Sequence, residues 1–387
     1  MRRELWLDRR GPLRRAAWLE DGVLTDLAID REDRPAHAGD IRLGRVARIV
    51  AGLDAAFVEI GLDQPALLNA ADMRPARRGA RIGQLLRTGQ TLLLQVKADA
   101  HGDKGAVVTM DVTLPGRFLV FMPQADGLHL SKRLGKGPEV GRLRQTLAES
   151  VPSRGGWIVR ADAAGVDPAL VALEAEALLE LWHGTETAAA SATAPALLRP
   201  APDAVARALA EWTGRGVEAI RAEGPALADT VRLWCRDRAP DLAALLQPHA
   251  GRPLLFETED LDGVIAGLGG RRVPLGQGGS LVIDRTEALT VIDVNGGERG
   301  NPLATNLDAA GEIARQLRLR NLAGIIIVDF VNMGRAGDRE AVIQALSHAV
   351  SNDPVATHVY GMSRLGLAEM TRARRGPALA DLLTETL

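Results

Sequence analysis

The sequence contains a single cysteine, Cys235, so it excludes a disulfide within the chain and a cysteine-rich zinc site. Such scarcity is typical of proteins from a reducing compartment, and we expect a cytoplasmic location. No apolar segment follows the charged start Met1-Arg2-Arg3-Glu4, so we expect no signal peptide. No run of about 18 apolar residues occurs either, so we expect no membrane-spanning helix.

Aromatic residues make up only 3% of the chain, and the formal net charge is only −2. The core must therefore rest on Leu, Val, Ile and Ala. With 46% apolar and 25% charged residues, the composition is that of an ordinary globular protein. The 387 residues are enough for several domains. A near-neutral chain must bind any polyanion through local basic clusters rather than through its overall charge.

The most informative stretch is 280–333, where two β-branched runs end in Asp293 and Asp329. Thr305 or Asn306 is expected to cap a helix that lies between these runs. This helix is predicted by apolar residues at the 3.6-residue period, namely Leu307, Ala310, Ala314 and Leu317.

A strand, a helix and a second strand in this order predict a parallel pair joined by a right-handed crossover. Asp293 and Asp329 would then lie at the carboxyl ends of neighbouring strands, which are about 4.8 Å apart. A cation relieves the repulsion of two such carboxylates, and Mg²⁺ suits them because it takes oxygen ligands and keeps several waters. Asn295 could orient a ligand through its amide. The alternative is that each aspartate only ties down a turn.

Five short apolar runs, at 41–50, 55–61, 65–68, 89–96 and 104–110, predict a small closed barrel. Arginine-rich strands with an exposed aromatic fit an OB-type surface that binds single-stranded nucleic acid. Phe57 is the candidate stacking platform, and the alternative is that it is a core residue.

Other segments carry weaker signals. The Ala-, Thr-, Ser- and Pro-rich stretch 184–202 is interpreted as a linker or a loop that marks a domain boundary. We expect a strand at 230–234 and the start of a last helix at 365–370. The glycine-rich tract 269–279 matches neither a P-loop nor a Rossmann fingerprint, and we interpret it as a flexible connector.

Several of these motifs together resemble the catalytic half of the RNase E/G family of bacterial endoribonucleases. The resemblance is carried by 279–295, 305–322, 329–333 and 363–370. Upstream, 55–58 and 104–106 are similar to the RNA-binding OB barrel of that family.

The resemblance implies an α/β multidomain fold. An RNase H-like domain would be built from 1–37 and 205–264, with an OB-fold domain at 38–115 inserted into it. A 5′-sensor domain would follow at 116–204, and a DNase I-like catalytic domain at 265–387.

The implied function is Mg²⁺-dependent hydrolysis of single-stranded RNA to 5′-phosphate and 3′-hydroxyl ends, in RNA processing or decay, with Mn²⁺ as a possible substitute ion. A non-catalytic RNA-binding protein on the same scaffold is the main alternative. A metal-dependent phosphoesterase acting on another substrate would leave the basic barrel unexplained.

Functional residues follow from the same resemblance. Asp293, Asn295 and Asp329 would be catalytic, and the two aspartates would be the metal ligands. RNA-binding roles fall on Phe57, Lys104, Arg318, Arg320 and Arg364. The 5′-phosphate pocket corresponds to Gly116, Val120 and Arg160.

The chain also departs from the family. Ala161 replaces the threonine of the phosphate pocket, so we expect weak 5′ sensing, and Leu67 replaces the second aromatic of the barrel. The sequence ends at Leu387 without the family's cysteine pair. We therefore expect no structural zinc, no zinc-linked tetramer, and a monomer or dimer.

Overall fold

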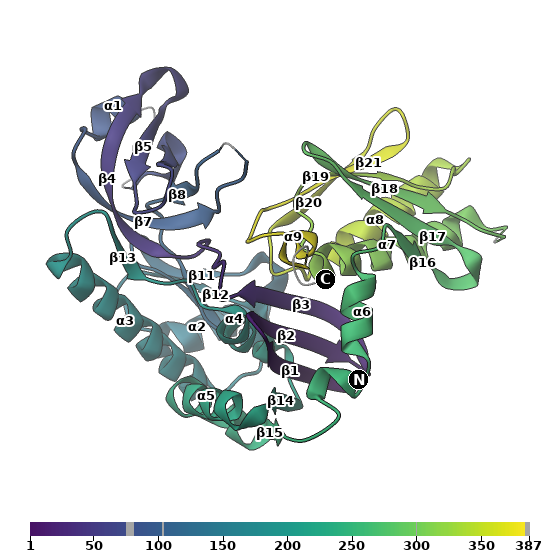
Figure 1. Cartoon of the computed structure of the whole chain (residues 1–387), viewed down its shortest axis with the longest axis horizontal. Coiled ribbons are helices and arrows are strands. Elements are labelled where there is room, and N and C mark those ends of the chain that lie inside the picture. The colour runs from purple at the N-terminus through teal and green to yellow at the C-terminus, as the bar shows by residue number, and fades with distance from the viewer. Residues whose placement is uncertain (75–80, 103, 299, 384–387) are drawn as a thin grey trace. The chain divides into compact units, whose positions relative to one another are not determined.

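The computed structural model describes residues 1–74, 81–102, 104–298 and 300–383. Its fold is mixed α/β, and the chain divides into two compact units (Figure 1). The first unit comprises Met1–Arg2, Arg15–Ile29 and Ala250–Leu387. The second comprises Arg3–Arg14 and Asp30–His249. None of the described helices combines the length and the apolar character needed to cross a lipid bilayer.

The second unit contains a closed five-stranded barrel, as the sequence predicts. The strand order is β4-β5-β6-β8-β7, and a further pairing of β4 with β7 closes the sheet. Its strands are β4 (Ile41–Val50), β5 (Ala55–Glu59), β6 (Ala66–Asn69), β7 (Thr91–Ala98) and β8 (Val107–Thr109). The barrel is consistent with an OB-like domain. The short helix α1 (Ile82–Leu85) precedes β7, and β13 (Ala196–Arg199) extends the sheet beside β4.

A second sheet of this unit has the order β11-β12-β10-β9. Its strands are β9 (Leu114–Pro115), β10 (Leu119–Met122), β11 (Gly127–Leu130) and β12 (Gly156–Val159). Helices α2 (Pro138–Ser150) and α3 (Pro168–Ser191) contribute Leu147, Val171, Ala175, Leu178 and Trp182 to the same hydrophobic core. The expected linker at 184–202 is wrong, because α3 continues through the Ala-rich segment to Ser191 and β13 follows.

The rest of the second unit contains three parallel strands in the order β15-β14-β1. They are β1 (Arg3–Arg10), β14 (Ala219–Glu223) and β15 (Leu246–His249), accompanied by α4 (Ala204–Trp212) and α5 (Gly224–Arg238). The expected strand at 230–234 is wrong, because this segment lies within α5, where Val231 and Cys235 supply a buried helical face.

The first unit contains a six-stranded sheet of order β16-β17-β18-β19-β21-β20. The strands are β16 (Arg272–Pro274), β17 (Ser280–Arg285), β18 (Leu289–Asn295), β19 (Gly324–Asp329), β20 (Thr357–Met362) and β21 (Leu367–Arg372). The expected last helix at 365–370 is wrong, since this segment forms a turn and β21. The unit also holds α6 (Leu261–Gly267), α9 (Leu379–Leu383), and residues of β2 (Leu13–Glu20) and β3 (Val23–Arg31).

Helices α7 (Pro302–Leu319) and α8 (Ala336–Val350) cover one face of this sheet (Figure 1). Alternate residues of β18 and β19, such as Ile292, Val294, Ile326 and Val328, face these helices and are buried. The residues between them belong to the opposite face. That face remains partly exposed, with Ile325 at 50% exposure.

Candidate active site

Asp293 and Asp329 are register partners in the parallel pair of β18 and β19. Each is the last or nearly the last residue of its strand, and each is exposed. The helix α7 connects the two strands, so the predicted strand–helix–strand unit is confirmed. The two carboxylates therefore lie on the same face and at the same edge of the sheet, about 4.8 Å apart along the hydrogen-bonding direction at the level of the backbone.

The side-chain amide of Asn295 forms a hydrogen bond with Asp293. Asn295 lies two residues beyond Asp293, on the same face of β18, and its Nδ2 donates to Asp293 Oδ2 at 2.8 Å. Asn295 is exposed, and its Oδ1 can act as an acceptor. Within the described residues, the carboxylate of Asp329 has neither a hydrogen bond nor an ion pair. Among the residues that the structure describes, neither acid therefore forms a salt bridge.

Ser280 adds a polar group beside this pair. It is the cross-strand partner of Asn295 on β17, so the two side chains share one face of the sheet. Its Oγ is buried and has no hydrogen-bond partner in the part of the chain that the structure describes. The sequence gives no signal for it beyond its position at the start of a strand.

The donor set suits a hard divalent ion. Two carboxylates in register offer oxygen ligands, and among the described residues no group of three His, Cys, Asp or Glu is placed to hold a metal. Mg²⁺ is commonly bound through one or two carboxylates while it keeps several waters, whereas zinc sites usually need four protein ligands or three. The metal-binding and catalytic roles of these residues stay predictions.

The glycine-rich tract is more than a flexible connector, because it packs against the end of β18. Gly297 has a φ of +59°, and a Cβ at this position would overlap the carbonyl group of Gly278. A Cβ on Gly279 would lie 3.1 Å from the carbonyl oxygen of Asn295. The absence of side chains here lets two turns approach closely beside the acidic pair.

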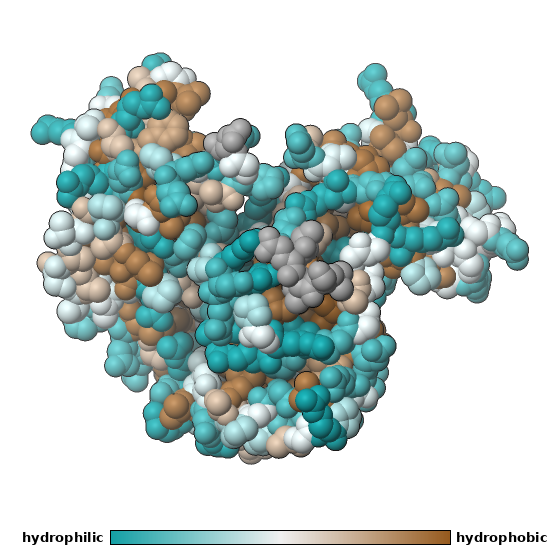
Figure 2. All heavy atoms as spheres, viewed as in Figure 1, coloured by the Kyte–Doolittle hydropathy of each residue, from teal (hydrophilic) through white to brown (hydrophobic). Residues whose placement is uncertain are grey.

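Arg364 lies in the turn between β20 and β21, and this turn is at the same edge as the acids. Leu367 of β21 is the register partner of Asp329, so the preceding turn projects beyond that edge. Arg364 is exposed, and Leu365 is 86% exposed. Figure 2 shows hydrophilic and hydrophobic side chains next to each other on this projecting turn.

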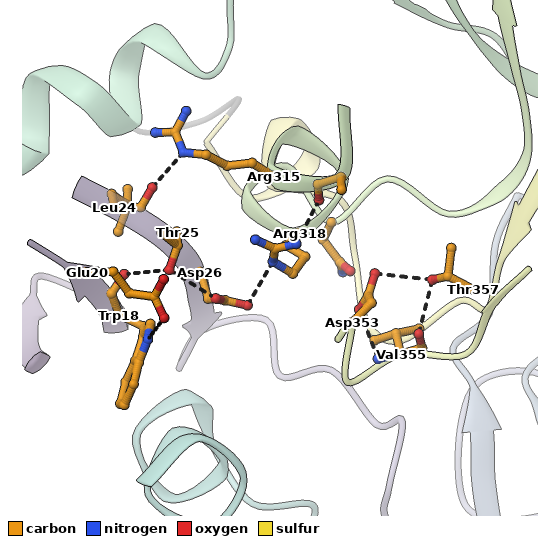
Figure 3. A network of polar contacts seen from close by, with 12 residues as sticks. Trp18, Glu20, Leu24, Thr25, Asp26, Arg315, Arg318, Asp353, Val355 and Thr357 are labelled. Carbon is orange, nitrogen blue, oxygen red and sulfur yellow. Dashed lines mark hydrogen bonds and ion pairs between the residues drawn. The ribbon is translucent and has the colours of Figure 1, made fainter. Parts of the chain in front are cut away.

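Arg318 and Arg320 are placed differently from Arg364. They lie at the carboxyl end of α7, whereas the acids lie near its beginning, and an 18-residue helix is about 27 Å long. Arg318 forms an ion pair with Asp26 at 3.1 Å, which Figure 3 shows. Arg320 is buried and donates to Gln316 Oε1 and to the carbonyl oxygen of Gly270. Burial lowers the pKa of the Arg320 guanidinium. These contacts give both arginines a structural role, and RNA binding by them stays a prediction.

On the barrel, Phe57 is half-buried, and the exposed Arg48 lies over its ring at 5.0 Å from the centroid. Leu67 is its cross-strand partner on β6. Lys104 is exposed, and its backbone forms an isolated antiparallel β-bridge with His101. Phe57 therefore belongs to a surface that combines its ring, the aliphatic side chain of Leu67 and the guanidinium of Arg48.

The three predicted residues of the 5′-phosphate pocket come together in the second unit. Arg160 donates from Nη1 to the carbonyl oxygen of Gly116 at 2.9 Å, and Val120 lies on the adjacent β10. The sequence did not reveal the role of Glu174, a buried residue of α3. Its carboxylate accepts the N–H groups of residues 117, 118 and 119. Burial raises the pKa of Glu174, while these three hydrogen bonds favour the ionised form.

Comparison with known proteins agrees with these features. Residues 113–375 match the Ribonuclease E/G family. Ribonuclease G of Escherichia coli (strain K12) is 36% identical over 387 residues, which cover 95% of this chain and 79% of that protein. Ribonuclease G of Haemophilus influenzae is 33% identical over 389 residues, covering 96% and 79%. Ribonuclease E of Nostoc sp. is 36% identical over 363 residues, covering 90% of this chain and 53% of that protein. The chain belongs to the Ribonuclease E/G family.

Proposed function

We propose that this chain is an endoribonuclease that hydrolyses single-stranded RNA with the help of Mg²⁺ and acts in RNA processing or decay. The single observation that supports the chemistry best is the register pairing of Asp293 with Asp329 at an exposed edge of the sheet. Kinship with enzymes named Ribonuclease G and Ribonuclease E supports RNA as the substrate. The exposed barrel surface around Phe57 suits unpaired bases.

In the proposed reaction, a water attacks the phosphorus of a phosphodiester and the bond to the 3′ oxygen breaks. The products are a 5′-phosphate and a 3′-hydroxyl. When bound at Asp293 and Asp329, the divalent ion would make a water more acidic and neutralise charge on the phosphate. Asn295 would fix the orientation of Asp293 through its Nδ2–H and present Oδ1 to a water or to the RNA.

We also propose a finer domain division, which rests on membership of the Ribonuclease E/G family. An RNase H-like domain would comprise 1–37 and 205–264, an OB-fold domain 38–115, a 5′-sensor-like domain 116–204 and a DNase I-like catalytic domain 265–387. We place the activity in the cytoplasm, since a lone buried cysteine suits a reducing compartment. A monomer or a dimer remains our proposal for the oligomeric state.

The test is cleavage of a fluorogenic single-stranded RNA by the full chain with Mg²⁺ and with EDTA. We expect cleavage only with Mg²⁺. Asp293→Asn and Asp329→Asn should each reduce the rate by about 1000-fold or more, because metal-assisted stabilisation contributes several kcal/mol. Asp284→Asn is the matched control, since Asp284 is a carboxylate on the adjacent β17 that is ion-paired with Arg271.

The rival function, non-catalytic RNA binding, predicts a different pattern. The chain would bind the RNA tightly, leave it uncut with Mg²⁺, and show no difference between wild type and the two Asn variants. Cleavage that survives both substitutions would instead place the chemistry elsewhere on the molecule.

A further inference from the structure

Asn306 lies on α7 and makes a pair of hydrogen bonds that no capping role explains. Its side chain is fully buried. Nδ2 donates to the carbonyl oxygen of Val331 at 2.8 Å, and Oδ1 accepts the N–H of Val331 at 3.0 Å. The helix cap is a different residue, Asn301, whose side chain accepts from the N–H of Ala304. Both of these hydrogen bonds thus go to the backbone of one residue, Val331, which lies 25 residues further along the chain.

The segment that Asn306 holds is the one that carries Asp329. β19 ends at Asp329, and Val331 follows two residues later. Beyond the end of a strand, the backbone no longer has a neighbouring strand to hold it. An asparagine side chain carries an NH2 donor group beside a carbonyl acceptor, so it can satisfy the N–H and the C=O of Val331 as a strand neighbour would.

This support matters because, among the described residues, the Asp329 carboxylate has no hydrogen bond of its own. The carboxylate of Asp293 is oriented by Asn295. In the described part of the chain, Asp329 receives no such hydrogen bond. The direction of its carboxylate therefore depends on its backbone, which Asn306 fixes from two residues away. An asparagine amide therefore orients each acid. Asn295 binds the carboxylate of Asp293 directly, whereas Asn306 binds the main chain two residues after Asp329.

We propose that Asn306 is a positioning residue that sets Asp329 at the geometry needed to bind a divalent cation jointly with Asp293. The inference rests on the proposed function of the acidic pair. Groups that orient metal ligands from behind typically change metal affinity or activity by about 10- to 100-fold when they are replaced. Asn306 touches neither the RNA nor the cation.

The experiment compares wild type with Asn306→Ala, Asn306→Asp and Asn321→Gly in the full chain. Asn306→Asp keeps the shape and the acceptor but loses the donor to Val331. Asn321 is the matched control. It follows the same helix, has a φ of +48° that suits glycine, and donates to the carbonyl oxygens of Arg375 and Pro377. Its bonds also stabilise the first unit but do not involve the segment of Asp329.

Three quantities are measured: Mn²⁺ binding from the electron paramagnetic resonance signal of the free ion, the Mg²⁺ concentration for half-maximal cleavage, and the KM for RNA at saturating Mg²⁺. For both Asn306 variants we expect Mn²⁺ binding about 10-fold weaker or more. The Mg²⁺ requirement should rise by a similar factor while the KM for RNA stays unchanged. Asn321→Gly should lower the melting temperature without changing either metal measurement.

The inference is overturned if a folded Asn306 variant binds Mn²⁺ as wild type does, or if Asn321→Gly weakens Mn²⁺ binding equally. If Asn306→Ala does not fold, Asn306→Asp decides the matter. If the wild type binds Mn²⁺ but leaves RNA uncut, the proposed nuclease function is refuted. The comparison of Mn²⁺ binding between wild type and the Asn306 variants still tests the role of Asn306. A wild type that binds no Mn²⁺ would refute both.

Discussion

Leu67 lies beside Phe57 on the surface of the barrel. It pairs directly with Phe57 across β5 and β6, where a second ring would extend the stacking surface. We expect Leu67→Phe to tighten binding of single-stranded RNA by about 1 kcal/mol, roughly fivefold, because stacking of a base on an aromatic contributes about 1–3 kcal/mol. Fluorescence anisotropy would measure the affinity for RNA, with Asp293→Asn present in both proteins so that the RNA is not cleaved. Leu197→Phe, on the half-exposed β13, is the control, and an equal gain there would refute the argument.

Ala161 follows Arg160 in the candidate phosphate pocket. Ala161→Thr would add a hydroxyl donor at the residue that follows Arg160, whose guanidinium donates to the Gly116 carbonyl. A hydrogen bond contributes about 1 kcal/mol, so the preference for 5′-monophosphate over 5′-hydroxyl RNA should rise about fivefold. The ratio of the two cleavage rates measures this preference. A strong preference already present in wild type would show that the pocket does not need the hydroxyl.

Individual residues could be predicted from the sequence where their chemistry follows from strand register alone. Asp293, Asn295 and Asp329 are such residues, since their positions in adjacent strands fix their common edge. Asn306 could not be predicted, because its position near a helix start resembles a cap while its true partner is Val331. Glu174 likewise resembles a surface glutamate on a helix, and only the fold brings it to the backbone at 117–119.

At the scale of elements, the turn after β18 depends on Gly297. Its φ of +59° is unfavourable for other residues, and a Cβ would collide with the backbone of Gly278. We expect Gly297→Ala to lower the free energy of unfolding by about 1–3 kcal/mol, the usual cost of a strained backbone position. Cleavage should fall as well, since the turn adjoins Asn295. Urea denaturation provides the measurement. Gly300→Ala, which meets no atom within 4 Å, should be nearly neutral.

Strands and helices were predicted correctly where β-branched composition or the helical period was clear, and wrongly where composition was ambiguous. The β-branched run of β18 and the apolar period of α7 predicted the correct types, although Leu307 is partly exposed rather than buried. The segment 367–372 contains helix formers such as Leu, Ala, Glu and Met, yet it pairs on both sides, with β19 and β20. Such tertiary pairing overrides local propensity, and no local pattern reveals it.

At the scale of the whole molecule, Cys235 offers a probe of unfolding. It is fully buried on α5, and burial raises the pKa of its thiol to about 11. At pH 8 the folded chain should react with a disulfide reagent at least about 10-fold more slowly than the chain in urea, because the thiolate is the nucleophile. Reaction of the folded chain at the urea rate would contradict the buried position.

The same thiol adds a pH dependence to stability. Its pKa rises from an ordinary value of 9.0 to about 11 on folding. Folding therefore favours the protonated thiol, and this contribution is fully present below about pH 9. It is lost as the pH rises toward 11, because the unfolded thiol ionises first. Replacement of Cys235 by alanine should reduce the decline of stability between these pH values.

The proposed chemistry assigns different tasks to the two compact units. The acidic pair and Asn306 belong to the first unit, and the barrel with Phe57 belongs to the second. Both the acidic pair and the barrel could be predicted from the sequence, because each is built from a contiguous stretch with its own residue pattern. Substitutions in the barrel should therefore change the KM for RNA, whereas substitutions at the acids should change the metal requirement and the rate.

The most direct test of the central claim is a titration of the full chain with Mn²⁺, followed by electron paramagnetic resonance and by competition with Mg²⁺. The account predicts one Mn²⁺ that Mg²⁺ displaces, and predicts that Asp293→Asn and Asp329→Asn each remove this site while Asp284→Asn retains it. Unchanged Mn²⁺ binding in either of the first two variants would contradict a cation held jointly by Asp293 and Asp329.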